Sequence, residues 1–315
     1  MANGTDYVKL VTHARTALNE GKNITASLRE YLNVPANTPE IIEIAYDLQA
    51  GSYIENVRND MGGYSRYCDE LAFVLRDACS RIHNIRTVLD IGTGEMTIFS
   101  GVASRVFSAN EELFACDISL SRLLKGREFI NSSLKSNTIQ PIFADFFELP
   151  FSDKSIDVVM STHALEPNGG DECRALIEIF RVARKLVVLF EPSYENNSPE
   201  GRARMDSLGY VKSLRGAIEG AGGSLIDSMQ IINNDFLRSP LNPTWAYVCK
   251  PGVALETESN GSEKDGVSYA CPITKKEMEK RDGFFSCKHS GLVYPVVDGI
   301  PILSSKYGIL ATIFS

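Results

Sequence analysis

From Arg86 onward, short apolar segments alternate with stretches in which apolar residues recur at helical spacing. This alternation is typical of a parallel sheet with crossover helices, because parallel strands need long connections and are buried on both faces. The first five strands are predicted at 87–91, 112–117, 140–144, 156–161 and 185–191. Segments 224–232 and 244–250 are joined by a short connection containing proline, so we expect an antiparallel hairpin there. The sequence therefore predicts an α/β fold with a seven-stranded, mostly parallel sheet.

The segments on either side of this sheet differ from it in pattern. Residues 1–83 carry apolar residues at helical spacing, which predicts an N-terminal helical cap on a core domain at 84–250. Residues 251–266 lose that periodicity and are rich in small and acidic residues, so we expect a linker. Residues 267–315 are then predicted to form a small α+β domain.

The overall composition limits the classes of partner. A net charge of −8 argues against a standing attraction to nucleic acid, whose binders usually carry a basic footprint. No apolar run approaches the roughly 20 residues that cross a bilayer, and the N-terminal residues lack the layout of a signal peptide. The seven cysteines are an odd number spread thinly along the chain, which favours reduced thiols. We expect a cytoplasmic protein without a membrane partner.

Two glycines and two acidic residues predict a ligand site. The strand ending in Asp90 and Ile91 runs directly into Gly92-Thr93-Gly94, where glycines let the backbone approach a ligand at the carboxyl end of the strand. Asp117 ends the next strand and suits the binding of both ribose hydroxyls of an adenosine. One Gly-x-Gly is often merely a tight turn, but acidic residues at successive strand ends favour an adenosine-binding crevice.

Three adenosine-containing ligands compete for this crevice. A nicotinamide dinucleotide motif needs a third glycine where Thr97 stands. A phosphate-binding loop for ATP needs Gly-Lys-Ser/Thr, whereas Gly94 is followed by Glu95. S-adenosylmethionine needs a carboxylate at the end of the first strand for its ammonium group, and Asp90 meets that need. The residues favour S-adenosylmethionine.

Four segments, in the right order, resemble one enzyme family. Residues 88–94 (Val-Leu-Asp-Ile-Gly-Thr-Gly) resemble the first motif of the Rossmann-like, class I S-adenosylmethionine-dependent methyltransferases. Residues 144–146 resemble the segment in which an acid binds the adenine amino group. Residues 149–159 and 161–166 resemble the ubiquinone-biosynthesis-like branch, with Pro167 where that branch usually has a histidine. The resemblance covers roughly residues 46–250 and implies S-adenosylmethionine as cofactor.

The resemblance implies a cofactor site around the glycine turn and the following strand ends. Its residues would be Tyr53, Asp90, Gly92, Thr93, Gly94, Asp117, Ile118, Asp145, Phe146, Ser161 and His163. Tyr53 would lie over the cofactor from the cap, although an aromatic residue on an amphipathic helix is as often part of the core.

The substrate side is less constrained, because methyl transfer needs mainly positioning, exclusion of water and, for a hydroxyl acceptor, loss of a proton. His163 has the ordinary pKa of a general base, or it lines the cofactor, as in the related branch. Glu191 and Tyr194 follow the fifth strand and could bind a polar substrate, or Glu191 caps the next segment. Three arginines could bind a phosphate or carboxylate, although solvated surface arginines are commoner: Arg202, Arg204 and Arg238.

The C-terminal unit resembles the small zinc-binding activator subunit shared by several RNA and release-factor methyltransferases, on Cys271, Cys287 and the Tyr294-Pro to Ile300-Pro segment. That family holds zinc with two Cys-x-x-Cys pairs. Thr274 and Ser290 take the second place of each pair here, and His289 could add only a third ligand. No metal is therefore expected.

The apolar tail of this unit, residues 292–297 and 300–303, is expected to form a strand pair that shields an edge or face of the main domain. It would do so within one chain, or reach a second protomer, which leaves a homodimer open.

Three functions follow as hypotheses. The first is methylation of an oxygen or nitrogen of a polar small-molecule substrate, such as a sugar or another biosynthetic intermediate. The second is methylation of tRNA or protein, which the activator-like tail motivates. Such enzymes typically carry Asn/Asp-Pro-Pro-Tyr/Phe after the fourth strand, whereas this chain has Ser-Thr-His-Ala-Leu at 161–165. The third is a cofactor-binding scaffold without catalysis.

Overall fold

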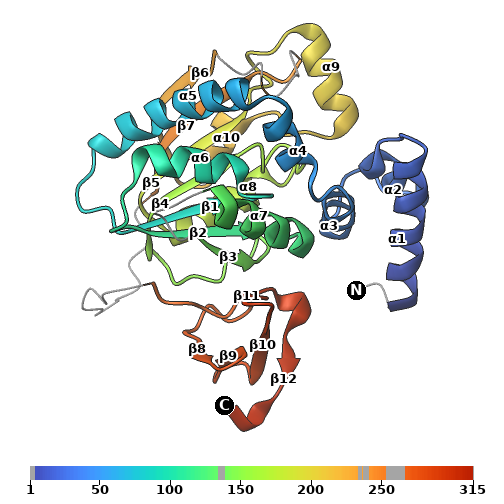
Figure 1. The fold of residues 1–315 in the computed structure, drawn as a ribbon, viewed down its shortest axis with the longest axis vertical. Coiled ribbons are helices and arrows are strands. Elements are labelled where there is room, and N and C mark those ends of the chain that lie inside the picture. Colours follow the sequence, from blue (N-terminus) through green and yellow to red (C-terminus); the bar gives the residue numbers. More distant parts are fainter. Residues whose placement is uncertain (1–3, 134–138, 233–235, 237–240, 253–266, 315) are drawn as a thin grey trace.

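The computed structural model describes residues 4–133, 139–232, 236, 241–252 and 267–314. Figure 1 shows a sheet with helices on both faces, a group of helices beside it and a small second sheet beneath it. Arg238 and all but the first two residues of the predicted linker lie outside the described ranges. Within those ranges, no helix is long and apolar enough to cross a membrane.

The main sheet has the predicted seven strands. They are β1 (Thr87–Ile91), β2 (Glu112–Asp117), β3 (Ile139–Phe143), β4 (Ile156–Thr162), β5 (Ala183–Pro192), β6 (Ser224–Gln230) and β7 (Thr244–Lys250). Their order is β3-β2-β1-β4-β5-β7-β6, with β1 to β5 parallel and β7 antiparallel to both neighbours. The predicted hairpin therefore closes the sheet, and all five residues of β1 are buried. The strand order reverses between β1 and β4, so the carboxyl end of β1 lies at the crevice where open α/β sheets bind ligands.

Two apolar layers enclose the sheet. On one face, α5 (Met61–Ser80) and α6 (Thr97–Val106) bury residues such as Leu71, Leu75 and Phe99 against the strands. On the other face, α8 (Glu172–Val182) and α10 (Leu214–Gly220) do the same. Two further helices complete the core: α7 (Leu120–Ser133), which follows β2, and α9 (Pro199–Leu208), which follows β5. Although α5 falls within the segment predicted as cap, it packs as a layer of the sheet domain.

The remaining N-terminal helices form the cap. They are α1 (Gly4–Asn19), α2 (Ile24–Leu32), α3 (Pro39–Leu48) and α4 (Ser52–Asn59). The first three share a small core of their own that includes Leu10, Leu28 and Ile41. Two of these helices begin after a capping side chain: Asn23 caps α2, and Thr38 caps α3 directly before Pro39. In Figure 1, α4 links this group to α5.

The C-terminal unit is an antiparallel sheet. Its strands are β8 (Glu279–Arg281), β9 (Phe284–Cys287), β10 (Leu292–Val297), β11 (Ile300–Pro301) and β12 (Ile309–Leu310). The sequence predicted a small α+β domain here. In the described residues, the helical part of this unit consists of two 3₁₀ turns, η2 (Ser305–Tyr307) and η3 (Thr312–Phe314).

The expected strand pair, β10 with β11, lies against the β3 edge of the main sheet in the same chain (Figure 1). Ile302 forms a parallel bridge with Phe143, and the Leu303 amide donates to the Phe143 carbonyl at 2.8 Å. The Ala270 amide donates to the Pro150 carbonyl at 3.0 Å. These backbone hydrogen bonds cover an edge that would otherwise present unpaired amides and carbonyls.

Hydroxyl groups surround the two cysteines of this unit. Cys271 Sγ lies 3.3 Å from the Tyr294 hydroxyl, and Cys287 Sγ lies 3.6 Å from Thr274 Oγ1. His289 is exposed, and the described residues contain no group of three potential metal ligands. The expectation that no metal binds here stays a prediction.

Candidate active site

The glycine turn at the end of β1 requires glycine for two reasons. Gly92 and Gly94 have φ of 60° and 57°, in the left-handed region that side chains disfavour. A Cβ on Gly92 would lie 2.3 Å from Ala164 Cβ. The Gly94 amide donates to Asp117 Oδ2 at 2.7 Å, so the end of β2 holds the turn in place.

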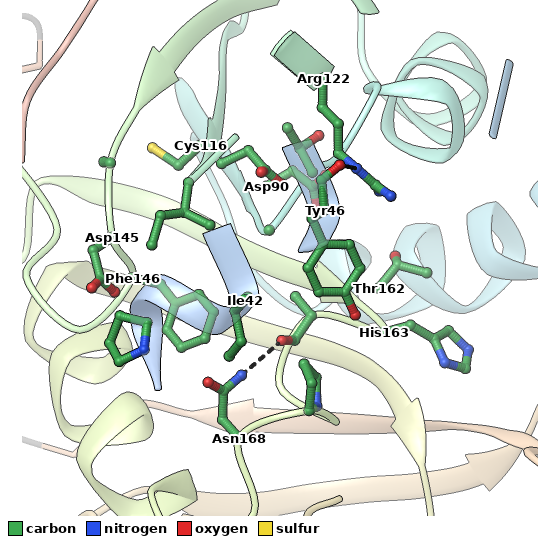
Figure 2. Close-up of a pocket in the computed structure, with 18 of the residues that line it drawn as sticks. Ile42, Tyr46, Asp90, Cys116, Arg122, Asp145, Phe146, Thr162, His163 and Asn168 are labelled. Carbon is green, nitrogen blue, oxygen red and sulfur yellow. Dashed lines mark hydrogen bonds between the residues drawn. The ribbon is translucent and has the colours of Figure 1, made fainter. Parts of the chain in front are cut away.

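A cavity opens above this turn (Figure 2). Most of the residues that sequence reasoning assigned to the cofactor line it: Tyr53, Asp90, Gly92, Thr93, Asp117, Ile118, Asp145, Phe146 and His163. Gly94 supports the turn without lining the cavity. Ser161 is fully buried and donates to Glu191 Oε1 at 2.8 Å, so it faces away from the cavity.

Three polar atoms of the cavity wall lack hydrogen-bond partners among the described residues: Asp90 Oδ1, Thr93 Oγ1 and Thr162 Oγ1. Buried polar atoms are rarely left unpaired, because losing water without replacement is costly. Burial, with Asp117 and Glu191 nearby, raises the pKa of Asp90 to about 8. A ligand that brings a positive charge and polar groups would satisfy this wall, so the residues fit S-adenosylmethionine.

Asp117 can still accept hydrogen bonds from a ligand, although both of its oxygens already accept one from a backbone amide. Oδ2 accepts from the Gly94 amide, and Oδ1 accepts from the Ser119 amide at 2.8 Å. A carboxylate has about four acceptor positions, so these two hydrogen bonds do not use all of them, and Asp117 can still accept from a ribose hydroxyl. Burial raises the pKa of Asp117, and the charge of Arg122 opposes that rise.

Asp145 and Phe146 form the far wall of the cavity (Figure 2). Asp145 Oδ1 accepts from the Phe147 amide at 2.9 Å, and burial raises its pKa to about 6. The rings of Phe146 and Phe147 lie 4.8 Å apart. An aromatic face next to a carboxyl group suits a flat base with an amino substituent.

Sequence reasoning missed Tyr46 and Arg122, which both line the cavity. Arg122 is buried, its Nε donates to the Tyr46 carbonyl at 2.8 Å, and its guanidinium lies 4.7 Å from the Tyr46 ring and 4.4 Å from the Tyr53 ring. One feature of the sequence could have indicated a special role for Arg122. Arg122 stands in the first turn of α7, where the helix dipole disfavours a cation, so another interaction must place it there.

His163 is held on both sides of its ring. Its backbone has φ of 55°, Nδ1 lies 2.8 Å from Glu166 Oε2, and Nε2 lies 2.8 Å from Thr244 Oγ1. Asn242 Nδ2 donates to the same Glu166 oxygen at 3.0 Å. Burial opposes the charge of His163, but Glu166 outweighs it, so the pKa of His163 lies above its ordinary value.

Neither Glu191 nor Tyr194 lines the cavity. Glu191 is fully buried and accepts from the amides of Ala164, Leu165 and Glu166 at 3.0 to 3.2 Å, so it holds the loop that carries His163. The sequence left open two other roles for Glu191, substrate binding or capping of the segment that follows it, whereas here it caps the loop after β4. Tyr194 donates instead to the exposed Asp206 at 3.2 Å.

Residues 88–185, which include the glycine turn and the His163 loop, match the family described as a methyltransferase domain. The chain carries a methyltransferase domain. This match confirms the predicted enzyme class, an S-adenosylmethionine-dependent methyltransferase, and the predicted cofactor. A comparison with curated proteins finds no match.

Solved structures share the fold. Magnesium protoporphyrin IX methyltransferase from Synechocystis, solved with bound S-adenosylhomocysteine, has 12% identity and a TM-score of 0.50, with 66% of this chain and 99% of that chain covered. The complex between the Haloferax volcanii Trm112 methyltransferase activator and a protein described as a methyltransferase gives 18% identity and a TM-score of 0.48, with 66% and 98% covered. At 12% identity, the likeness to the Synechocystis enzyme supports the methyltransferase fold alone.

Proposed function

We propose that this methyltransferase transfers a methyl group to an oxygen or nitrogen atom of a polar small molecule. The observation that carries the proposal is the enclosed cavity at the strand ends, with the unpaired carboxylate oxygen of Asp90 in its wall and a polar cluster around His163 beside it. Bound S-adenosylmethionine supplies an activated methyl group, so the protein has to position the acceptor and exclude water.

Each polar residue of the cavity would bind a different part of the cofactor. Asp90 would accept from its ammonium group, Asp117 from the ribose hydroxyls and Asp145 from the adenine amino group, with Phe146 beside the base. Tyr53 and Arg122 would cover the cavity from the cap side.

His163 is the candidate general base for a hydroxyl or ammonium acceptor. Glu166 fixes the proton on Nδ1, which leaves the lone pair on Nε2, where Thr244 now donates. A hydroxyl of the methyl acceptor would have to take the place of the Thr244 hydroxyl at Nε2. Such a base typically contributes roughly 10²- to 10⁴-fold in rate.

We further propose that the core belongs to the ubiquinone-biosynthesis-like branch and that the C-terminal unit is an activator-like domain acting in cis. The motifs at 149–166 support the first point. Backbone pairing of Ile302 and Leu303 with Phe143 supports the second, because the unit covers an open sheet edge of its own chain.

A tRNA or protein acceptor is the second candidate, and the docked C-terminal unit is the observation that favours it. A methyl-transfer assay with labelled S-adenosylmethionine separates the two. We expect turnover on polar small molecules. Turnover confined to tRNA or protein would replace the proposal, and cofactor binding without any turnover would leave a scaffold.

A further inference from the structure

Arg204 lies on α9, the helix that follows β5 (Figure 1). Its neighbours Gly201 and Met205 are buried, so this side of the helix faces inward. The guanidinium lies 5.5 Å from the centre of the Tyr210 ring. Arg204 Nη1 is buried, and no described residue forms a hydrogen bond or an ion pair with this side chain.

Asn242 is a second incompletely paired group in the same cluster. It is only 6% exposed, and its Nδ2 donates to Glu166 Oε2 at 3.0 Å. Its Oδ1 is buried and has no partner among the described residues. The same Glu166 oxygen lies 2.8 Å from His163 Nδ1, so the unpaired acceptor on Asn242 belongs to the cluster that holds the candidate base.

Backbone geometry places Arg204 near this cluster, because the Val211 amide, next to Tyr210, donates to the Glu166 carbonyl at 3.0 Å. The charges of the cluster agree with this placement. Burial lowers the pKa of His163, Glu166 raises it, and the charge of Arg204 lowers it again. Burial raises the pKa of Glu166, and Arg204 is among the charges that lower it. No ion pair joins Glu166 and Arg204 among the described residues, and Glu166 Oε2 instead contacts His163 and Asn242.

A partly buried guanidinium without an anion is costly, and carboxylates and phosphates match its planar set of donors. We propose that Arg204 binds an anionic group, a carboxylate or a phosphate, on the methyl acceptor, and that Asn242 Oδ1 accepts from a hydroxyl or amino group of the same molecule. The inference rests on the proposed function and names its substrate class: small anionic molecules that also carry a hydrogen-bond donor.

The test uses the full chain saturated with S-adenosylhomocysteine. Its probes are hydroxy acids, amino acids and sugar phosphates, each carboxylate paired with its neutral amide and each phosphate with the free alcohol, titrated calorimetrically. We expect binding of charged members, with the neutral counterparts roughly 10- to 100-fold weaker, the size of a charge-assisted hydrogen-bond pair. The best binders then serve as acceptors in the transfer assay.

Three variants assign the preference to Arg204. Arg204→Met should remove the discrimination between charged and neutral members, whereas Arg204→Lys should keep part of it. Arg202→Met changes an arginine two positions along the same helix and should keep the full preference. The affinity for S-adenosylhomocysteine should stay the same in all three, which also reports that each variant folds.

Two results would overturn the inference: neutral members that bind the wild-type protein as well as charged ones, or no binding by any charged member. A charge preference that survives Arg204→Met would assign the anion to another residue and also refute it. Failure of the wild-type protein to bind S-adenosylhomocysteine would instead refute the proposed function, so the two failures are distinguishable.

Discussion

At the scale of single residues, the site is marked by polar atoms that the protein leaves unpaired. Asp90 Oδ1 and Thr93 Oγ1 lack partners in the cofactor cavity, and Arg204 Nη1 and Asn242 Oδ1 lack them beside His163. Sequence alone placed Asp90 at the end of a strand. It could not show which of its atoms stay unpaired, because that depends on packing from the cap and from β2.

The pKa of Asp90 predicts how cofactor affinity varies with pH. Since burial raises this pKa to about 8, the carboxyl is protonated at neutral pH, whereas the cofactor ammonium favours the ionised form. Affinity for S-adenosylhomocysteine should therefore rise from pH 6.5 to 8.5, by up to about tenfold per unit below pH 8, with release of a proton. Calorimetry in buffers of different ionisation enthalpy measures that proton. Asp90→Asn should abolish the dependence, and a flat profile in the wild-type protein would contradict this role.

The raised pKa of Asp90 also affects the stability of the unliganded protein, which should fall as the pH rises, whereas cofactor affinity should increase. The folded pKa of Asp90 lies above its ordinary value near 4, so the unliganded folded state binds the extra proton between about pH 4 and 8. Its contribution therefore lowers the free energy of unfolding as pH rises through that window. Ligand binding should offset this loss.

His163→Gln tests the candidate base. With a proposed acceptor, kcat should fall by roughly 100-fold or more, while the affinity for S-adenosylhomocysteine stays within about threefold. In the wild-type enzyme kcat should rise with pH through a pKa above the ordinary histidine value, because a base must be neutral and Glu166 favours the charged form. A loss of cofactor affinity with kcat preserved would show that His163 only lines the cofactor.

At the scale of elements, the turn after β1 depends on its contact with the loop after β4. Gly92→Ala would bring two Cβ atoms to 2.3 Å and put alanine at φ of 60°, so the free energy of unfolding should fall by at least about 2 kcal/mol, with loss of cofactor binding. Gly222 has φ of 82° with nothing within 4 Å of its Cβ position, so Gly222→Ala carries only the backbone strain. Denaturant unfolding of both variants separates the two effects. Equal losses would argue against the contact with Ala164.

The elements were largely predictable, and the site less so. Short apolar strands and a proline-containing connection indicated the seven strands of the sheet and its closing hairpin, because burial on both faces leaves a clear pattern. The inward direction of Tyr46 was not predictable, since it depends on how α3 closes over the strand ends. The role of Glu191 in holding the His163 loop was also not predicted, because that loop follows β4 and is about 26 residues away in the sequence.

At the scale of the whole molecule, α3 links the C-terminal unit to the cofactor cavity. Glu43 accepts from Lys306 at 2.6 Å, from Tyr307 at 2.7 Å and from Tyr7 at 3.1 Å. Ile42 and Tyr46, on the same helix, line the cavity. The resemblance to an activator suggested that the unit shields an edge, but residue spacing could not show this second contact.

Lys306→Met tests that link. Losing the contact with Glu43 should loosen α3 and weaken S-adenosylhomocysteine binding by roughly 3- to 10-fold. Lys275 forms a similarly buried ion pair with Glu178 of α8, at 2.7 Å, away from the cavity, so Lys275→Met is a matched control. Both variants should lower the melting temperature by similar amounts, and only Lys306→Met should reduce affinity. Equal affinities in the two variants would refute the link.

The central claim is that the cavity between β1 and β2 binds the adenosine part of S-adenosylmethionine, with Asp117 on the ribose. Calorimetric titration with S-adenosylhomocysteine tests it most directly. The account predicts one site per chain, unchanged in Glu219→Ala on the exposed face of α10 and weakened by roughly 1–3 kcal/mol in Asp117→Ala, because buried hydrogen bonds are lost. Absence of binding by the wild-type protein, or full affinity in Asp117→Ala, would contradict it.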